Sequence, residues 1–187
     1  MASVAVYDAS VLYPAPLRDL LLRLARTGLF RAKWTDAILD ECFEAIRRQR
    51  PDLAPDRLAR TRALMVQAVP DCLVDGYQPL IDELELPDPD DRHVLAAAIQ
   101  AGAEIIVTLN LRDFPDAVLE QYGIEAQSPD EFVLDLLSLS PAVVAAVVEE
   151  QAADLKNPPM SAEQLLDTLE RSLPAATREL RAWMHGA

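Results

Sequence analysis

The segment Leu86-Pro-Asp-Pro-Asp-Asp-Arg-His-Val-Leu-Ala-Ala-Ala-Ile-Gln-Ala-Gly102 has the strongest helical pattern of the chain. Asp88 is an N-cap candidate, Pro89 suits the first helical position, and Gly102 suits the C-terminal stop. The run Glu104-Ile-Ile-Val-Thr108 follows directly. Such a nearly continuous apolar strand is typical of a parallel sheet covered on both faces. A helix that leads into a strand of this kind indicates an α/β fold.

The chain on either side of this segment also alternates between strands and helices. Before it, alternating apolar residues predict a buried strand over 3–7 that ends at Asp8. Apolar residues at helical spacing then predict helices over 17–26, 35–48 and 56–69, followed by a brief strand over 72–74 and an acidic loop to residue 85. After it, we expect a short helix over 116–122 and an extended segment over 123–127. This order predicts a three-layer α/β/α sandwich on a short parallel sheet.

The pattern of expected elements changes at Ser128, after which no strand is expected. Helices are expected from there on over 129–137, 141–155, 161–173 and 175–185, with prolines at each break. We therefore divide the chain into an α/β domain, residues 1–127, and a helical C-terminal extension, residues 128–187. Two roles for the extension remain open. It is a platform for a partner protein or a homodimer, or its helices cover one side of the sheet and pack on one another.

Composition excludes several classes of protein. Of 187 residues, 51% are hydrophobic and 26% are charged, as in globular proteins. Five glycines leave no room for a glycine-rich phosphate cradle, and no window holds the roughly 20 apolar residues of a membrane span. The N-terminus has no basic region and runs into a strand, so we expect a cytoplasmic protein with no signal peptide and no membrane contact. Cys42 and Cys72 fit no metal-binding spacing and are expected in the core.

The charge is acidic and unevenly spread. A net charge of −14 argues against a general nucleic-acid coat protein, which would be basic. Residues 31–62 nevertheless hold eight Lys/Arg against six Asp/Glu, whereas residues 71–91 hold eight acids and no base. This pattern suits a protein that binds divalent cations and then binds a polyanion. It equally suits an acidic surface that keeps the protein in solution by repulsion.

Three acids are placed where an α/β fold presents its ligands. Asp8 follows the first strand, Glu41 lies in the helix that starts near residue 35, and Asp91 lies in the first turn of the Asp88 helix. Each also has an ordinary explanation, as a turn cap, a surface acid and a partner of the helix dipole respectively. Together they are informative, because strand ends and helix starts converge at one edge of such a sheet. Carboxylates there repel one another unless a cation or protons intervene.

The chemistry of these side chains predicts the kind of cation. Hard oxygen ligands select Mg²⁺ or Mn²⁺ rather than Zn²⁺. Such an ion orients a water nucleophile and neutralises charge on a phosphodiester. A metal-dependent phosphodiesterase is therefore one function that the three acids predict.

Four motifs carry a resemblance to a known family. They are Val6-Tyr-Asp8-Ala-Ser10, Thr35-x₅-Glu41, Asp91-x₁₀-Gly102 and Val107-Thr108-x-Asn110-x-x-Asp113-Phe114. The pattern is similar to that of the PIN-domain nucleases, and among these to the VapC-type toxins of bacterial toxin–antitoxin pairs. It covers residues 3–127, and the Asp91 helix followed by the Val-Thr strand is its most specific part. The resemblance implies a ribonuclease for structured RNA that is inhibited by a small antitoxin, which inserts a segment into the site.

The resemblance also implies roles for individual residues. The acidic metal-binding positions are matched by Asp8, Glu41 and Asp91. Small hydroxylic positions around the metal are matched by Ser10 and Thr108, which implies that they support the ligands.

The remaining polar residues near these motifs leave alternatives open. Asn110 matches a position that is often a fourth acid, so the resemblance supports one tightly held metal more than two. Asp113 substitutes for that acid as a further catalytic carboxylate, or else it only caps the next helix. Arg92 and His93 are about 100° apart on a helix, so they do not both face the site with Asp91. One of them contacts substrate phosphate or Asp88, or they make structural pairs.

The favoured prediction is a Mg²⁺- or Mn²⁺-dependent endoribonuclease, the toxin of a toxin–antitoxin pair. One rival is a catalytically weak or inactive PIN-like scaffold that binds RNA or a protein, and the neutral Asn110 favours it. The other is a phosphoryl-transfer hydrolase for a small molecule, which also places an acid after its first strand. Against that rival, Lys33 and Lys156 are the only lysines, and neither suits its core.

Overall fold

The computed structural model describes residues 2–186 and has a four-stranded parallel sheet at its centre. The strand order is β2-β1-β3-β4, with bounds Val4–Tyr7 for β1, Arg31–Lys33 for β2, Ile105–Val107 for β3 and Glu125–Gln127 for β4. In the register, Ala5 pairs with Ala32 on one side and with Ile105 on the other. The two apolar strands thus take the centre of the sheet. The two strands that carry charged residues take its edges.

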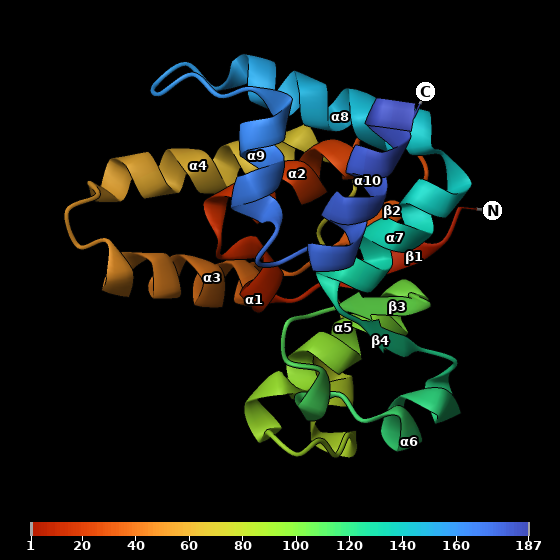
Figure 1. Ribbon diagram of the computed structural model, residues 1–187. Coiled ribbons are helices and arrows are strands. Elements are labelled where there is room, and N and C mark those ends of the chain that lie inside the picture. The colour runs from red at the N-terminus through yellow and green to blue at the C-terminus, as the bar shows by residue number, and fades with distance from the viewer. Residues whose placement is uncertain (1, 187) are drawn as a thin grey trace.

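Helices cover both faces of the sheet (Figure 1). On one face lie α5, Arg92–Ala101, and α6, Asp116–Leu119. On the other lie α2, Ala15–Ala25, and α7, Pro129–Leu139. This arrangement confirms the predicted α/β/α sandwich.

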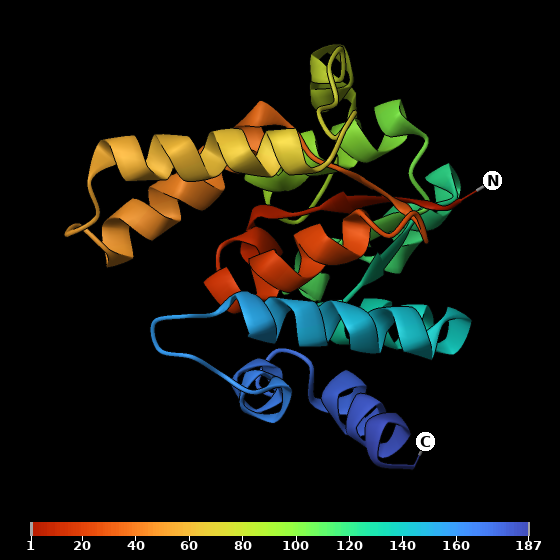
Figure 2. The same cartoon turned by 90° about the horizontal axis from the view of Figure 1, so that it is seen from above.

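Three further helices come from the N-terminal part of the chain. The short α1, Ala9–Leu12, follows β1 directly. Then α3, Asp36–Gln49, and α4, Pro55–Ala68, form a pair that extends beyond the sheet (Figure 2). Arg62 of α4 binds the side chains of Asp36 and Asp40 on α3. These ion pairs fix α4 on α3, the helix that carries Glu41.

An aromatic cluster connects the sheet with α7. The ring of Tyr7 stacks on Trp34 at a centroid distance of 6.1 Å, and its hydroxyl donates to the Leu21 carbonyl of α2 at 3.1 Å. Phe132 of α7 packs edge-on against both Tyr7 and Phe30, at 6.2 and 4.9 Å. All four rings are buried. The core of the sheet therefore continues into the C-terminal helices.

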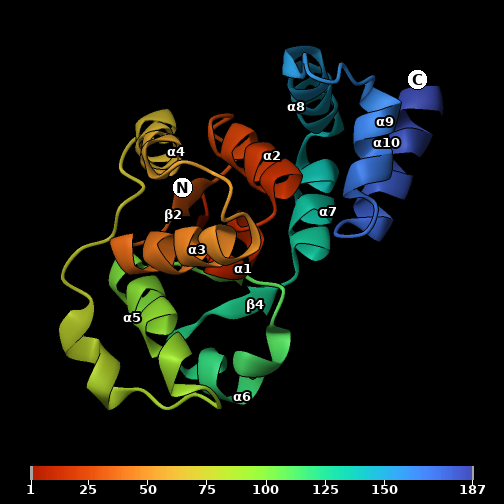
Figure 3. The same cartoon turned by 90° about the vertical axis from the view of Figure 1, so that its left-hand side faces the viewer.

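The remaining helices form an outer layer. They are α8, Pro141–Asp154, α9, Ala162–Leu169, and α10, Pro174–Gly186. In Figure 3 they stack outside α2 and α7, which they contact. The extension thus packs on itself and, through α7, against the sheet; its role as a partner platform stays a prediction. Between residues 2 and 186, no helix combines the length and hydrophobicity that crossing a bilayer requires.

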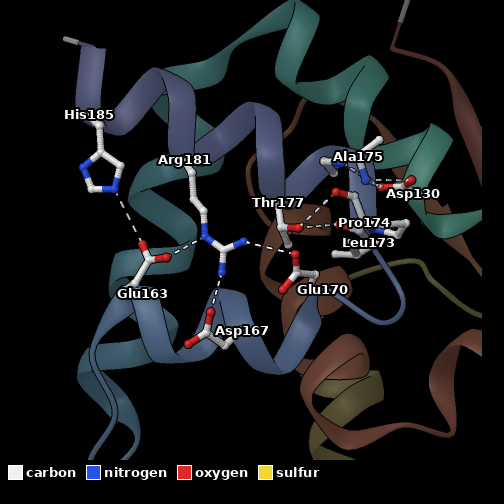
Figure 4. A network of polar contacts seen from close by, with 11 residues as sticks. Asp130, Glu163, Asp167, Glu170, Leu173, Pro174, Ala175, Thr177, Arg181 and His185 are labelled. Carbon is white, nitrogen blue, oxygen red and sulfur yellow. Dashed lines mark hydrogen bonds and ion pairs between the residues drawn. The ribbon is translucent and has the colours of Figure 1, made fainter.

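Polar contacts hold α10 in place (Figure 4). The guanidinium of Arg181 on α10 lies 2.5 Å from Glu163, 2.6 Å from Asp167 and 3.6 Å from Glu170, all on or next to α9. The carboxylate of Asp130 on α7 accepts hydrogen bonds from the backbone N–H groups of residues 175 and 176, at 3.1 and 2.8 Å. The first N–H groups of a helix have no partner inside it, so Asp130 acts as a cap supplied by another helix.

Several local predictions were wrong. Strand β2 was not expected, and residues 72–74 form a single bridge, Leu73 with Trp34, in place of a strand. Short 3₁₀ turns occupy 78–83, 89–91, 111–113 and 120–122. The Asp88 carboxylate accepts from the Asp90 N–H at 2.9 Å and so caps the turn over 89–91. As a result, α5 begins only at Arg92, and Asp91 immediately precedes the helix.

Candidate active site

Asp8 is a buried carboxylate at the carboxyl end of β1. Its Oδ1 accepts from the Ala9 N–H at 2.8 Å, which is the turn cap that its position predicts. Its Oδ2 accepts from the hydroxyls of Ser10 at 2.6 Å and Thr108 at 2.9 Å. The side chain is only 4% exposed. Asp8 is therefore both a cap and a rigidly held acid, because three donors from two strand ends fix its orientation.

The two hydroxyl residues connect the loops that follow β1 and β3. Ser10 Oγ also accepts from the Leu109 N–H at 3.0 Å, and Thr108 Oγ1 accepts from the Asn110 N–H at 3.0 Å. The two hydroxyl oxygens lie 3.3 Å apart. Each hydroxyl thus donates to Asp8 and accepts from the backbone after β3. Ser10 and Thr108 thus both contact Asp8; their role as supports of a metal ligand stays a prediction.

Glu41 reaches the site from α3. This helix starts at the carboxyl end of β2, where the Thr35 hydroxyl accepts from the Ile38 N–H at 3.0 Å and caps it. The Oε1 atom of Glu41 lies 2.7 Å from Nε2 of His93 on α5. The Glu41 side chain is 47% exposed and that of His93 is 12% exposed. Glu41 is therefore a solvent-facing acid that is anchored at one oxygen.

Asp91 lies where the other acids converge. Burial, followed by the negative charges of Asp8, Asp88, Asp113 and Glu41, raises the pKa of Asp91 to about 7 from its usual value of 3.8. In the part of the chain that the structure describes, no group donates a hydrogen bond to its carboxylate. Acids from segments far apart in the sequence thus act on one carboxyl group, as the sheet topology predicts.

The structure distinguishes between the two readings of Asp113. The N-cap of α6 is Pro115, and no side chain caps that helix. Asp113 therefore does not cap it, and its carboxyl group is one of the charges that act on Asp91. Asn110 is exposed on the same loop. The chain thus has no acid at residue 110, but it has Asp113 three residues further on.

Arg92 and His93 have different surroundings. Burial lowers the pKa of His93, but the hydrogen bond and charge of Glu41, with the charges of Asp8 and Asp91, outweigh burial and raise it overall. His93 faces Glu41, so its contact is with a candidate metal ligand. The Nε atom of Arg92 is buried and finds no partner among the described residues.

The side chains fit Mg²⁺ or Mn²⁺ by chemistry, since the candidate ligands are all carboxylate oxygens. Over residues 2–186, no three His, Cys, Asp or Glu side chains are already arranged to enclose an ion. The contacts described above supply a physical reason. Without a cation the acids repel one another, which favours arrangements that keep their carboxylates apart.

One member of this cluster and one contact within it were not predicted from the sequence. Asp88 was expected only as a helix cap, yet its charge also acts on Asp91. The pairing of His93 with Glu41 joins positions 52 residues apart. The only signal for Asp88 was its position directly before Pro89 and close to Asp91; the sequence carries no signal for the pair.

Comparison with known proteins decides the family. The family model described as "PIN domain" matches residues 4–112, more than half of the chain. The chain belongs to the PIN-domain family. A second family model, described as "VapC50 C-terminal domain", matches residues 129–182 of this PIN-domain chain. The matched PIN region contains Asp8, Glu41 and Asp91.

A curated relative agrees with both matches. The chain is 43% identical over 106 residues to "Putative ribonuclease VapC50" of Mycobacterium tuberculosis. The aligned region spans 57% of this chain and 62% of the relative, less than two thirds of that protein's length. No solved structure matches the chain. The resemblance to VapC-type PIN-domain proteins, predicted from the motifs, is confirmed by these matches.

Proposed function

We propose that this PIN-domain chain is a Mg²⁺- or Mn²⁺-dependent endoribonuclease. The observation that carries the proposal is the set of acids around Asp91: burial raises its pKa most, and the charges of Asp8, Asp88, Asp113 and Glu41 raise it further. When these acids are ionised, their mutual repulsion lowers the stability of the folded protein. A divalent cation bound between them would relieve that repulsion. The name of the curated relative supports the choice of RNA as substrate.

The proposed roles follow from how each carboxylate is held. Asp8, Glu41 and Asp91 would hold the cation, which supplies a polarised water and neutralises charge on the phosphodiester. Asp8 is fixed by Ser10 and Thr108, so it sets the position of the site. Asp91 accepts no hydrogen bond within residues 2–186, so its carboxylate oxygens are left for the cation, which would favour the ionised form. Asp91 or Asp113 accepts the proton of the attacking water, and no covalent enzyme intermediate forms.

The partners of the protein are part of the same proposal. The match of residues 129–182 to a VapC50 C-terminal domain and the similarity to VapC50 support a toxin of a toxin–antitoxin pair in the cytoplasm. Its substrate is then cellular RNA, and its inhibitor is a small antitoxin protein. A homodimer stays a prediction, which sedimentation velocity measures directly.

The test is cleavage of total cellular RNA, with the new ends mapped by sequencing. We expect defined ends with Mg²⁺ or Mn²⁺, none with EDTA, and none with Asp91→Asn in either condition. A circular-dichroism melt of Asp91→Asn shows that the variant is folded. Cleavage that survives both EDTA and Asp91→Asn would refute the mechanism.

One alternative function has a specific observation in its favour. Asn110 replaces a common fourth acid, and no three of the described side chains are prearranged for an ion. Both features suit a PIN-like scaffold that binds RNA or a protein without cutting it. Calorimetric titration with Mn²⁺ discriminates, because a scaffold shows no binding that depends on Asp8.

A further inference from the structure

We propose that His93 is a positioning residue for Glu41: it holds the carboxylate through one oxygen and leaves the other for the cation. This inference rests on the proposed function, because it concerns how one of the three candidate metal ligands is oriented. It differs from the role expected from the sequence, in which Arg92 or His93 contacts substrate phosphate or Asp88.

The contact has the geometry of a strong, directed hydrogen bond. Nε2 of His93 and Oε1 of Glu41 lie 2.7 Å apart, which is short for a bond between nitrogen and oxygen. The two residues come from α5 and α3, so the bond also fixes these helices relative to each other at the site. Glu41 is 47% exposed at the end of a flexible side chain, whereas the His93 ring is 12% exposed. The covered ring is thus the rigid partner and the acid is the mobile one.

The chemistry of the two groups assigns the direction of this bond. An ionised carboxylate only accepts hydrogen bonds, so Nε2 of His93 carries the hydrogen and donates it. The other ring nitrogen, Nδ1, is buried and has no partner among residues 2–186. Neither nitrogen is therefore left to contact an RNA phosphate, because one donates to Glu41 and the other is covered. The second oxygen of Glu41, Oε2, accepts no hydrogen bond from the described part of the chain.

Asp8 is also oriented by side chains that donate to it, although both of its oxygens accept a hydrogen bond. Ser10 and Thr108 donate to its Oδ2, and both hydroxyls lie outside the set of candidate ligands. His93 would do for Glu41 what these hydroxyls do for Asp8. Partners of this kind orient metal ligands, and their loss typically weakens metal affinity by about 10–100-fold.

The experiment is a calorimetric titration of the full chain with Mn²⁺. His93→Phe keeps a ring without a donor, and we expect its Mn²⁺ affinity to fall by about 10–100-fold. His93→Gln places an amide N–H near the position of Nε2 and should keep most of the affinity. His185→Phe is the matched control, because His185 also lies near a glutamate, at 3.7 Å from Glu163, but belongs to α10. Its affinity should equal that of the wild type.

A double-variant cycle shows whether His93 acts through Glu41. Glu41→Gln alone should weaken Mn²⁺ binding, and adding His93→Phe should cause no further loss. The inference is overturned if His93→Phe binds Mn²⁺ like the wild type, or if it loses as much affinity with Glu41→Gln as without it. Weaker RNA binding in EDTA with unchanged Mn²⁺ affinity also overturns it, and would point to a phosphate contact.

A second pair of variants tests the inference if His93→Phe is misfolded. If His93→Phe does not fold, His93→Gln is compared with His93→Asn, whose shorter side chain brings its amide near Nδ1 and not near Nε2. The Asn variant should then be the weaker binder, and equal affinities contradict the inference. If the wild type binds no Mn²⁺, the proposed function fails and the inference falls with it. If only the His93 variants are unaffected, the inference alone fails.

Discussion

Thr108 Oγ1 donates a hydrogen bond of 2.9 Å to Oδ2 of Asp8, and so joins the carboxyl ends of β3 and β1. Both side chains are buried, at 0% and 4% exposure. The same hydroxyl oxygen accepts from the Asn110 N–H at 3.0 Å, so one side chain satisfies a buried acid and the loop after β3. The orientation of the first candidate ligand therefore depends directly on the packing of the two central strands.

Replacing Thr108 by Val removes this hydroxyl and keeps the shape of the side chain. A buried carboxylate and a backbone N–H then lose a partner, and we expect the free energy of unfolding to fall by about 1–3 kcal/mol. Urea denaturation measures the change. Thr108→Ser keeps the hydroxyl and should cost less, and RNA cleavage should fall further with Val than with Ser. Equal stabilities of the two variants would show that the hydroxyl contributes nothing.

The raised pKa of Asp91 predicts that the stability of the metal-free protein depends on pH. Its folded-state pKa of about 7 lies above the usual 3.8, so between these values the folded protein holds a proton that the unfolded chain lacks. Stability in EDTA therefore falls as the pH rises from about 4 to about 7. Asp91→Asn removes the ionisable group. Thermal melts should show the variant more stable than the wild type at pH 8, with a much smaller difference at pH 5.

Asp90→Asn is the control for this prediction, since Asp90 lies beside Asp91 but is exposed, and its charge is not among the largest causes of the raised pKa. Adding Mg²⁺ at pH 8 should stabilise the wild type and have little effect on Asp91→Asn. A difference between wild type and Asp91→Asn that is the same at pH 5 and pH 8 contradicts the account of the charge cluster.

Asp130 predicts an effect confined to the outer layer of helices. Its carboxylate accepts from the N–H groups of Ala175 and Ala176 at the start of α10. Asp130→Ala leaves these groups without the cap, and should lower the free energy of unfolding by about 1 kcal/mol. Glu149→Ala, an exposed site on α8, is the control and should change little. The rate of RNA cleavage by folded Asp130→Ala should equal that of the wild type; a lost activity would place α7 in the site.

The fold was predictable where its signals are local. Strands β1 and β3 are apolar runs, and the helices after residue 128 begin at or near prolines and serines that cap or start them. Strand β2 carries no such signal, because only Ala32 of Arg31–Lys33 is buried and its neighbours are charged. Residues 72–74 have the apolar pattern of a strand, yet they make only one bridge with the segment after β2. Whether each of these two segments forms a strand therefore depends on its pairing in the folded protein and not on its local sequence.

The candidate site was predictable where it depends on topology. The end of β1 and the start of α5 must meet at one sheet edge, so the convergence of Asp8 and Asp91 follows from the strand order. The bond from His93 to Glu41 depends on how α3 and α5 are placed relative to each other. No local pattern encodes that placement. No local pattern shows either that Asp113 does not cap α6 or that its charge raises the pKa of Asp91.

The most direct test of the central claim is a Mn²⁺ titration followed by electron paramagnetic resonance, in which free Mn²⁺ gives the signal and bound Mn²⁺ does not. The account predicts that the wild type removes free Mn²⁺ from solution at neutral pH, and that Asp8→Asn and Asp91→Asn each leave most of it free although both are folded. Folded variants that bind Mn²⁺ as tightly as the wild type, or a wild type that binds none, would contradict it.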